Sequence, residues 1–334
     1  MIKSDRKFGV EIEFTTSTAS KMTAIRRRLN VVDDGSLRPL PFAGEYVSGV
    51  LSGEEGEKEI HNVCEVLKKY GGNCDNPKTS MHIHLDGRRL QGTLISSKRR
   101  PTHNIRTYAI SNRLRKELGM LNIKHLVNDE TYNMRTTAEF CHTRIDSITY
   151  ISKAPITKHP LINYTYYWLE KPDRFKWLRN TFYFYTLFSD VMEGIVSNSR
   201  RFGNMYCIPL GSSYSLDEIA NTKTEADIKD VWYKHRPQGN HYDNSRYHNV
   251  NLHCYWDRHG TVEIRSHGGT VEANKILLWL RLHQTIVDKL EDTDFEELRL
   301  MKGTPKEFVD FLEDEMLAEY VKRLLGYFSG IKIQ

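Results

Sequence analysis

Three pairs of charged or imidazole side chains, each pair two residues apart, lie in segments where polar and apolar residues alternate. The pairs are Glu11 and Glu13, His82 and His84, and Glu263 and Arg265, and a fourth alternating segment carries Glu45. Residues two apart on a β-strand point to the same side, so each pair is expected on one face of a sheet. A sheet face with carboxylates, imidazoles and a guanidinium group is suited to holding metal ions and phosphates.

The glutamate pair favours a cation. Two carboxylates on one strand face raise each other's pKa unless a cation or a basic partner lies between them. Mg²⁺ takes hard oxygen ligands and usually keeps water and substrate phosphates, so it suits Glu11 and Glu13. The alternative is a solvent-facing strand with two glutamates of no function, and the pair alone does not decide between the two.

The other two pairs also admit two interpretations each. Two histidines on one strand face occur in metal sites, and they also occur as polar pairs beside a buried acid. Arginine grips phosphate through two hydrogen bonds and is always charged, but a Glu-x-Arg pair can also be an exposed ion pair. No Walker loop, dinucleotide-binding fingerprint or Gly-x-Ser-x-Gly motif occurs, which argues against P-loop, Rossmann and common hydrolase functions.

Hydrophobic periodicity and turn residues predict the elements that must position these side chains. Strands are expected at 7–15, 44–48 and 81–86, together with a hairpin whose arms are 250–256 and 261–267. Helices are expected from a capping box at 52–55 to about residue 70, and at 175–198, 272–290 and 305–325. Residues 211–247 are predicted to form a polar loop around one short helix. Antiparallel-looking strand pairs with helices between them indicate the α+β class.

Composition narrows the class of protein. The net charge is +5, a mild bias that is compatible with anionic ligands. The five cysteines are scattered without paired spacing and no apolar stretch is long enough to cross a membrane, so we expect a cytoplasmic protein without a membrane partner. Arginines in the 88–116 stretch make nucleic acid a weakly supported partner, because no zinc-finger, helix-turn-helix or RNA-binding signature accompanies them.

Taken in order, the segments resemble the amidoligase family of the glutamine synthetase and glutamate–cysteine ligase superfamily. The family pattern runs Phe-Gly-x-Glu-x-Glu-Phe, Asp-x-Ser-Leu, Glu-x-Val-Ser, a helix, His-x-His, and Gly-Thr-x-Glu-x-Arg followed by Gly-Thr. The chain has FGVEIEF at 8–14, DGSL at 34–37, EYVS at 45–48, MHIHLD at 81–86, GTVEIRSHGGT at 260–270 and an arginine-rich NSRRFGNMYCIPL at 198–210. It departs from the family just before His82, where Cys-Gly is usual, and over 90–195.

The resemblance implies a glutamine synthetase-like fold and a set of site residues. The expected fold is a curved antiparallel sheet, or half-barrel, with helices packed on its convex side, in a single catalytic domain over 1–334 with a family-divergent helical insertion at 88–195. The implied metal-side residues are Glu11, Glu13, Glu45, His82 and Glu263. The implied ATP contacts are His84, Arg265 and Arg201, and the implied catalytic arginines are Arg265, Arg200 and Arg201.

The implied activity is that of an ATP-dependent carboxylate–amine ligase using Mg²⁺, with Mn²⁺ as an alternative. A small-molecule or peptide carboxylate would attack the γ-phosphate to give an acyl phosphate, and an amine would then displace phosphate and leave an isopeptide-like amide. The amine must arrive unprotonated, and Asp217, Glu218 or Asp243 could take its proton. Two other interpretations stay open: a metal-dependent phosphoesterase or nuclease, and a nucleotide-binding relative without catalysis. The sequence names neither substrate and leaves the oligomeric state open.

Overall fold

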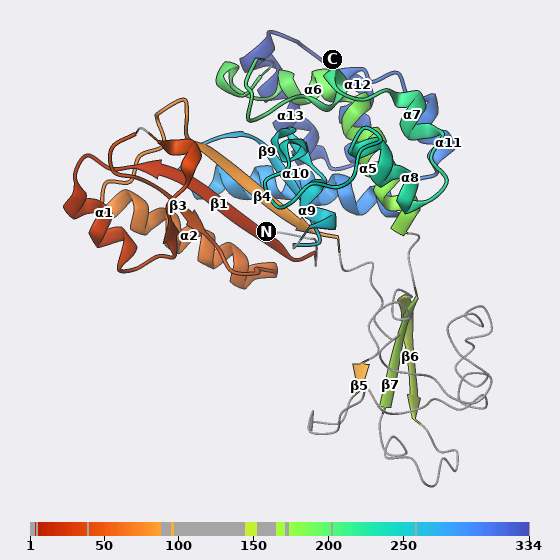
Figure 1. Cartoon of the computed structure of the whole chain (residues 1–334), viewed down its shortest axis with the longest axis horizontal. Coiled ribbons are helices and arrows are strands. Elements are labelled where there is room, and N and C mark those ends of the chain that lie inside the picture. Colours follow the sequence, from red (N-terminus) through yellow and green to blue (C-terminus); the bar gives the residue numbers. More distant parts are fainter. Residues whose placement is uncertain are drawn as a thin grey trace. The chain divides into compact units, whose positions relative to one another are not determined.

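The fold is taken from a computed structural model that describes residues 4, 6–38, 40–87, 95–96, 144–151, 165–170, 174–201, 203–257 and 259–333 (Figure 1). The chain divides into two compact units, one made of residues 1–87 and 175–334 and the other of residues 88–174. In the described part of the chain, no helix combines the length and the apolar character needed to cross a membrane.

A six-stranded antiparallel sheet with the order β2-β3-β1-β4-β9-β8 organises the first unit. Its strands are β1 (Phe8–Thr15), β2 (Val31–Val32), β3 (Ala43–Val47), β4 (Ser80–Asp86), β8 (Val250–Asn251) and β9 (Thr261–Gly268). Every neighbouring pair runs antiparallel. The α+β class and the strands predicted at 7–15, 44–48 and 81–86 are confirmed.

Alternation along the strands gives this sheet two chemically different faces. Ile12 lies opposite Tyr46 on one side and Met81 on the other, and all three side chains are buried. The residue before it, Glu11, lies opposite His82 on the other face. Because side chains in register across a sheet share a face, the apolar residues collect on one surface and the acids and imidazoles on the opposite one.

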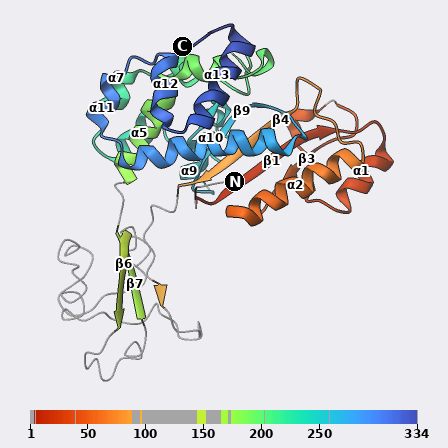
Figure 2. The same cartoon turned by 180° about the vertical axis from the view of Figure 1, so that it is seen from behind.

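Helices α2 (Gly53–Lys69) and α10 (Ala273–Asp292) cover the apolar face and contact each other (Figure 2). Gly56 lets α2 approach β1 closely, since a Cβ atom at this position would come 2.7 Å from the Phe8 ring. On α10 the Trp279 ring lies 5.0 Å, centroid to centroid, from His267 at the end of β9. The predicted helix after residue 52 is therefore present. Its predicted capping box is wrong, because the Ser52 side chain makes no capping hydrogen bond.

Helix α1 (Ala19–Arg26) lies beside α2 at the far end of the sheet (Figure 1). The remaining helices of the first unit gather around an aromatic core. They are α5 (Arg174–Leu187), α6 (Ser189–Gly194), α7 (Leu216–Ala220), α8 (Glu225–Trp232), α9 (His253–Trp256), α11 (Phe295–Leu300), α12 (Pro305–Leu312) and α13 (Glu315–Ser329). Trp177, Phe182 and Phe184 of α5 are almost completely buried, and Phe184 contacts Phe308 of α12 at a centroid separation of 5.7 Å. These aromatic residues of the predicted 175–198 helix therefore serve core packing.

Four predicted elements need correction. The single helix expected at 305–325 is two helices, because Glu313 has a left-handed backbone with φ of 50° and Asp314 then caps α13. The expected hairpin has paired strands β8 and β9, but 253–256 is a helical turn, since the Asn251 side chain accepts a hydrogen bond from the His253 backbone N–H. Likewise, 175–198 is split into α5 and α6, and 211–247 holds two α-helices, α7 and α8.

The second unit contains a three-stranded antiparallel sheet with the order β5-β7-β6. These strands are β5 (Ile95–Ser96), β6 (Arg144–Ile151) and β7 (Thr165–Glu170). They fall within the 88–195 segment predicted to be a helical insertion, much of which lies outside the described residues. The prediction of one catalytic domain over 1–334 with an insertion at 88–195 stays a prediction.

Candidate functional site

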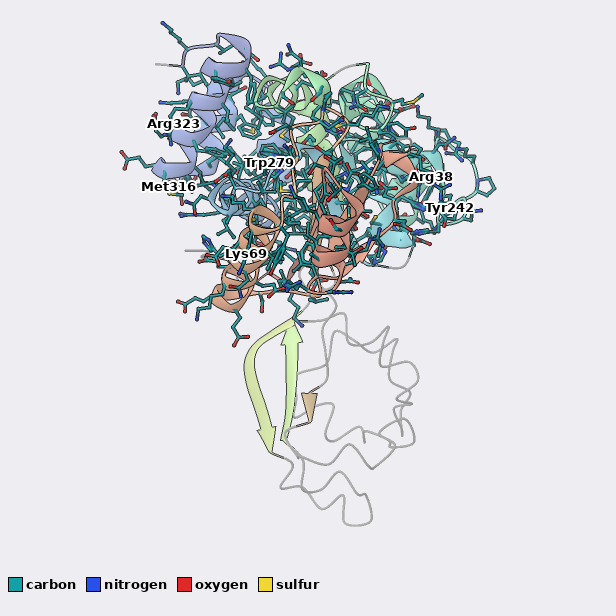
Figure 3. The ribbon with its side chains drawn as sticks, turned by 90° about the vertical axis from the view of Figure 1, so that its left-hand side faces the viewer. Arg38, Lys69, Tyr242, Trp279, Met316 and Arg323 are labelled. Carbon is teal, nitrogen blue, oxygen red and sulfur yellow. The ribbon has the colours of Figure 1, made fainter. Side chains whose placement is uncertain are left out.

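A pocket of about 640 Å³ opens on the polar face of the six-stranded sheet. This volume lies in the usual range of small-molecule sites, about 300–1,000 Å³. The sheet supplies Glu11, Glu45, His82, His84, Asn251, Glu263 and Arg265; the loop after β2 supplies Asp33, Asp34, Gly35, Ser36 and Arg38; and the remaining lining is Tyr206, His241, Tyr242, Arg246, Tyr247, His253, Cys254, Asp257 and His259. Arg38 and Tyr242, from two of these walls, lie on the same side of the unit in Figure 3.

Glu11 links the two histidines of β4. Its Oε2 atom lies 3.0 Å from His82 Nδ1, and its Oε1 atom lies 3.3 Å from His84 Nε2. The other ring nitrogen of His84 is 3.1 Å from the Thr261 hydroxyl on β9. Burial raises the pKa of Glu11, but the two imidazoles lower it by more, so the pKa lies well below its ordinary value. Glu11 is therefore a carboxylate at neutral pH.

Glu263 on β9 is the most heavily hydrogen-bonded acid of the pocket. Arg265 donates to its Oε1 atom, while the Asn251 amide donates to Oε2 over 2.6 Å and the Cys254 thiol over 3.3 Å. Burial raises the pKa of Glu263, but Arg265 and then His84 lower it to about 2. Burial lowers the pKa of Arg265, but the Glu263 carboxylate and its neighbour Glu11 raise it by more, so both groups of this pair are charged.

The charge on His84 depends on the same carboxylates. Burial lowers the pKa of His84, but Glu11 and then Glu263 outweigh it, and the pKa rises to about 8. The His84 Nε2 atom is buried and makes no hydrogen bond of acceptable geometry, although it lies close to Glu11. An imidazole held this way is either a cation facing anions or a nitrogen ligand for a cation.

Glu13 lies deeper and on the side of the pocket nearer β3. The Ser80 backbone N–H and hydroxyl both donate to its Oε2 atom over 2.6 Å, and the Ser80 hydroxyl also lies 2.8 Å from His82 Nε2. Burial is the main cause that raises the pKa of Glu13. Next to it, Ser36 hydrogen bonds hold the pKa of Asp34 below its ordinary value despite burial.

Glu45 is the one carboxylate of this face for which the described residues record no hydrogen bond or ion pair. Burial raises its pKa, and the neighbouring acids Glu11, Asp34, Glu13 and Glu263 raise it further, to about 10. A carboxyl group with four acids around it and no basic partner is protonated at neutral pH unless a cation replaces the proton.

Three groups of side chains in the described part of the chain each bring ligand atoms within 4.8 Å of one another: Glu11, Glu45 and His82; Glu13, Asp34 and Glu45; and His84, Cys254 and Glu263. Glu45 belongs to two of them. The first two groups are dominated by oxygen donors, which Mg²⁺, Ca²⁺ and Mn²⁺ prefer. Together with the unpartnered Glu45 carboxyl and the unpartnered His84 nitrogen, this donor set fits a hard divalent cation.

The structure brings together most of the residues predicted from the sequence, but not all. Glu11, Glu13, Glu45, His82, His84, Glu263 and Arg265 lie on one sheet face, and all except Glu13 line the pocket. Arg200 is buried behind β9, where it donates to the Arg265 backbone oxygen. Arg201 donates to the backbone oxygens of Val196 and Phe328, so its guanidinium is bound to the C-terminal helix and does not line the pocket.

The candidate acids of the 211–247 segment also lie outside the pocket lining. Asp243 forms an ion pair with Arg236 and caps the short 3-10 helix Asn244–Tyr247. Asp217 and Glu218 stand in the first turn of α7. Other pocket residues, such as Asn251, His241 and Asp257, were not predicted from the sequence. Asp34 belongs to the DGSL motif, but the others lie in segments where no periodic sequence pattern indicates which residues meet in the fold.

Fold and pocket together define an α+β protein with an acid- and imidazole-lined site on an open antiparallel sheet. Residues 170–287 match the family model described as "Putative amidoligase enzyme". This match covers about a third of the chain and supports the resemblance to the amidoligase family found in the motifs. The matched region includes β9 with Glu263 and Arg265, while β1, β3 and β4 lie before it. No curated protein and no solved structure matches the chain.

Proposed function

We propose that the chain is an ATP-dependent carboxylate–amine ligase that forms an amide through an acyl phosphate, with Mg²⁺ or Mn²⁺ and ATP on the polar face of a glutamine synthetase-like sheet. The observation that carries this proposal is Glu45. Its carboxyl group lies among four acids without a basic partner, which is a costly arrangement unless a cation binds there.

The acids would share the work of holding cations. Glu11, Glu45 and His82 form one donor group, and Glu13 and Asp34 form a second one around the same Glu45. Divalent cations held here would neutralise phosphate oxygens and so allow a carboxylate to approach the γ-phosphate. Glu263 belongs to the site because its Oε1 atom lies 3.4 Å from His82 Nδ1 and forms an ion pair with Arg265.

Arg265 and His84 would act on the phosphate side. Arg265 is oriented by Glu263 and lines the pocket, so its guanidinium can bind a phosphate oxygen in a fixed position. His84, with a pKa near 8, carries a positive charge through much of the neutral range and can stabilise the charge on a transferring phosphoryl group. Arg200 supports Arg265 through its backbone oxygen and would act by positioning it.

The test is product formation with defined partners. Purified protein is incubated with Mg·ATP, a panel of carboxylates (amino acids, peptides and cell-wall fragments) and a panel of amines (ammonium, amino acids and polyamines). Amide products are identified by mass spectrometry, and ADP and phosphate are quantified. The ligase proposal expects ADP and phosphate release that needs both a carboxylate and an amine.

Two other outcomes would contradict the proposal. Hydrolysis of a phosphodiester without ATP would identify a phosphoesterase or nuclease that uses the same acids. Tight Mg·ATP binding with no ADP formed with any partner would indicate a nucleotide-binding relative without catalysis. If Arg265→Ala leaves the protein's biological effect intact, chemistry at this sheet face is not its function.

A further inference from the structure

A His–Asp pair lies in the pocket on segments that the site described above does not use. His241 Nδ1 is 2.6 Å from Asp257 Oδ2, and both residues line the pocket. His241 lies just before the 3-10 helix Asn244–Tyr247, and Asp257 is the residue that ends α9. The contact therefore joins two loops that are 16 residues apart in the chain.

The pair is oriented so that one nitrogen of His241 is left for a ligand. An ionised carboxylate only accepts hydrogen bonds, so Nδ1 carries the proton in this contact and Nε2 is the free acceptor when the ring is neutral. The side chain of His241 is 35% exposed, whereas that of Asp257 is 16% exposed. The base therefore faces the pocket while its carboxylate partner is covered, as in other carboxylate-oriented histidines.

A third imidazole connects this pair with the phosphate side of the pocket. The His259 ring lies 6.4 Å from the His241 ring and 5.9 Å from the His84 ring, measured between centroids. A substrate that contacts both His84 and His241 would therefore extend past the His259 ring, across both of these distances. This matches the needs of a reaction in which an acyl phosphate forms on the sheet and a second substrate arrives from the side.

The other titratable groups near His241 are poorer bases. His253 on α9 directs Nδ1 to the Tyr233 hydroxyl over 2.6 Å, and burial lowers its pKa. Burial and then His84 lower the pKa of His259. The Tyr242 ring lies 5.1 Å from the His241 ring, centroid to centroid, and the Arg246 guanidinium lies over the Tyr242 ring.

Asp243, the loop acid nearest in sequence, is also unsuited. Arg236 grips both of its oxygens, and the Ser245 backbone N–H donates to one of them. Burial raises the pKa of Asp243, but the Arg236 and Ser245 hydrogen bonds lower it to about 2. A carboxylate held in this way takes up a proton only in strong acid.

We propose that His241 is the general base that takes a proton from the incoming ammonium substrate, and that Asp257 is the positioning residue that orients it. This inference rests on the proposed function. The ammonium group gives one proton to His241 Nε2 and becomes a neutral amine. The amine lone pair then forms the C–N bond, the C–O bond to phosphate breaks, and the second N–H proton leaves on hydrogen phosphate. The His241 imidazolium returns its proton to solvent at its exposed edge.

The experiment compares two small acceptors in the amide-forming assay: ammonium, which is protonated at neutral pH, and hydroxylamine, which is mostly unprotonated there. His241→Gln should lower kcat/KM for ammonium about 100-fold or more, the usual contribution of a general base, and change that for hydroxylamine little. Raising the pH should recover part of the ammonium reaction. Asp257→Asn should give a smaller loss with a shifted pH profile, and Asp257→Glu should restore activity in part.

The chain offers a matched control. His235 forms the same contact with Asp230, Nδ1 to Oδ2 over 2.6 Å, on the exposed surface and away from the pocket lining. His235→Gln should leave both reactions unchanged. Equal losses with ammonium and hydroxylamine in His241→Gln, no loss in that variant, or a selective ammonium loss in His259→Gln alone would overturn the inference. A wild-type protein that forms no amide with any amine of the panel contradicts the proposed function itself, and the inference falls with it.

Discussion

The same strands form both faces of the six-stranded sheet, yet one face buries apolar side chains and the other buries charged and polar ones. On one face Ile12, Ile83 and Ile264 are fully buried under α2 and α10 and form an ordinary core. On the other face Glu13, His82 and Glu263 are nearly as buried. Burying charge is costly unless it is paired, and the Glu45 position remains unpaired among the described residues. The difference indicates that the polar face is arranged for a ligand at some expense to stability.

The largest effect that separates the two faces is expected for Glu45→Gln. Glutamine has the shape of a protonated glutamate, which is the form of Glu45 in the metal-free protein because its pKa is about 10. The variant should therefore fold normally but lose the negative charge that a cation needs. We expect ligase turnover to fall by at least about 100-fold, as steady-state ADP release measures. Turnover within a few-fold of wild type would remove Glu45 from the site.

A substitution on the apolar face should lower the stability of the fold and leave turnover unchanged. Ile83 of β4 is fully buried between Val10 of β1 and Ile264 of β9. Ile83→Ala leaves a cavity in a packed layer, so we expect the free energy of unfolding to fall by about 2–5 kcal/mol, measured by urea denaturation. The remaining folded protein should retain its turnover number. In the same measurement, Glu45→Gln should change stability little, and a loss as large as that of Ile83→Ala would mean that the polar face is structural.

The polar face should contribute to the pH dependence of the metal-free protein. The folded-state pKa is about 10 for Glu45 and about 8 for His84, both above their unfolded values of 4.5 and 6.5. These two groups bind more protons in the folded chain than in the unfolded one, so the stability that they contribute falls as pH rises. His84 contributes fully below pH 6.5 and loses its contribution as pH passes 8, while Glu45 loses its contribution up to about pH 10.

Thermal unfolding in a chelator from pH 6.5 to 9 measures this effect. We expect the Tm of the wild type to fall relative to that of Glu45→Gln as the pH rises, because the glutamine cannot ionise. Parallel curves for the two proteins would contradict the raised pKa of Glu45.

The smallest effect is expected for Glu54→Gln. Glu54 lies in the first turn of α2, on the helix that covers the apolar face, and it is exposed. Its loss removes only a weak interaction with the helix dipole, about 0.3–1 kcal/mol. Turnover should be unchanged in the same ADP-release assay. A marked loss of turnover in this variant would show that activity depends on charge far from the pocket, and would contradict the assignment of activity to the polar face alone.

The sequence predicts the sheet face better than the pocket walls. Alternation in β1 and β4 is enough to place Glu11 and His82 on one face, because strand geometry fixes side-chain direction locally. The partner of Arg201 is the Phe328 backbone oxygen, 127 residues away, and no local pattern encodes such a contact. The same holds for His241 and Asp257, which meet only after α9 interrupts the predicted hairpin.

The most direct test of the account is divalent cation binding at Glu45. Titration calorimetry of Mn²⁺ at pH 7, in buffers of different ionisation enthalpy, measures both affinity and proton release. The account predicts that wild-type protein binds Mn²⁺ with release of about one proton, since the cation replaces the proton on a carboxyl group with a pKa of about 10. Glu45→Gln should bind much more weakly and release fewer protons. Equal affinity and equal proton release in the two proteins would contradict the account.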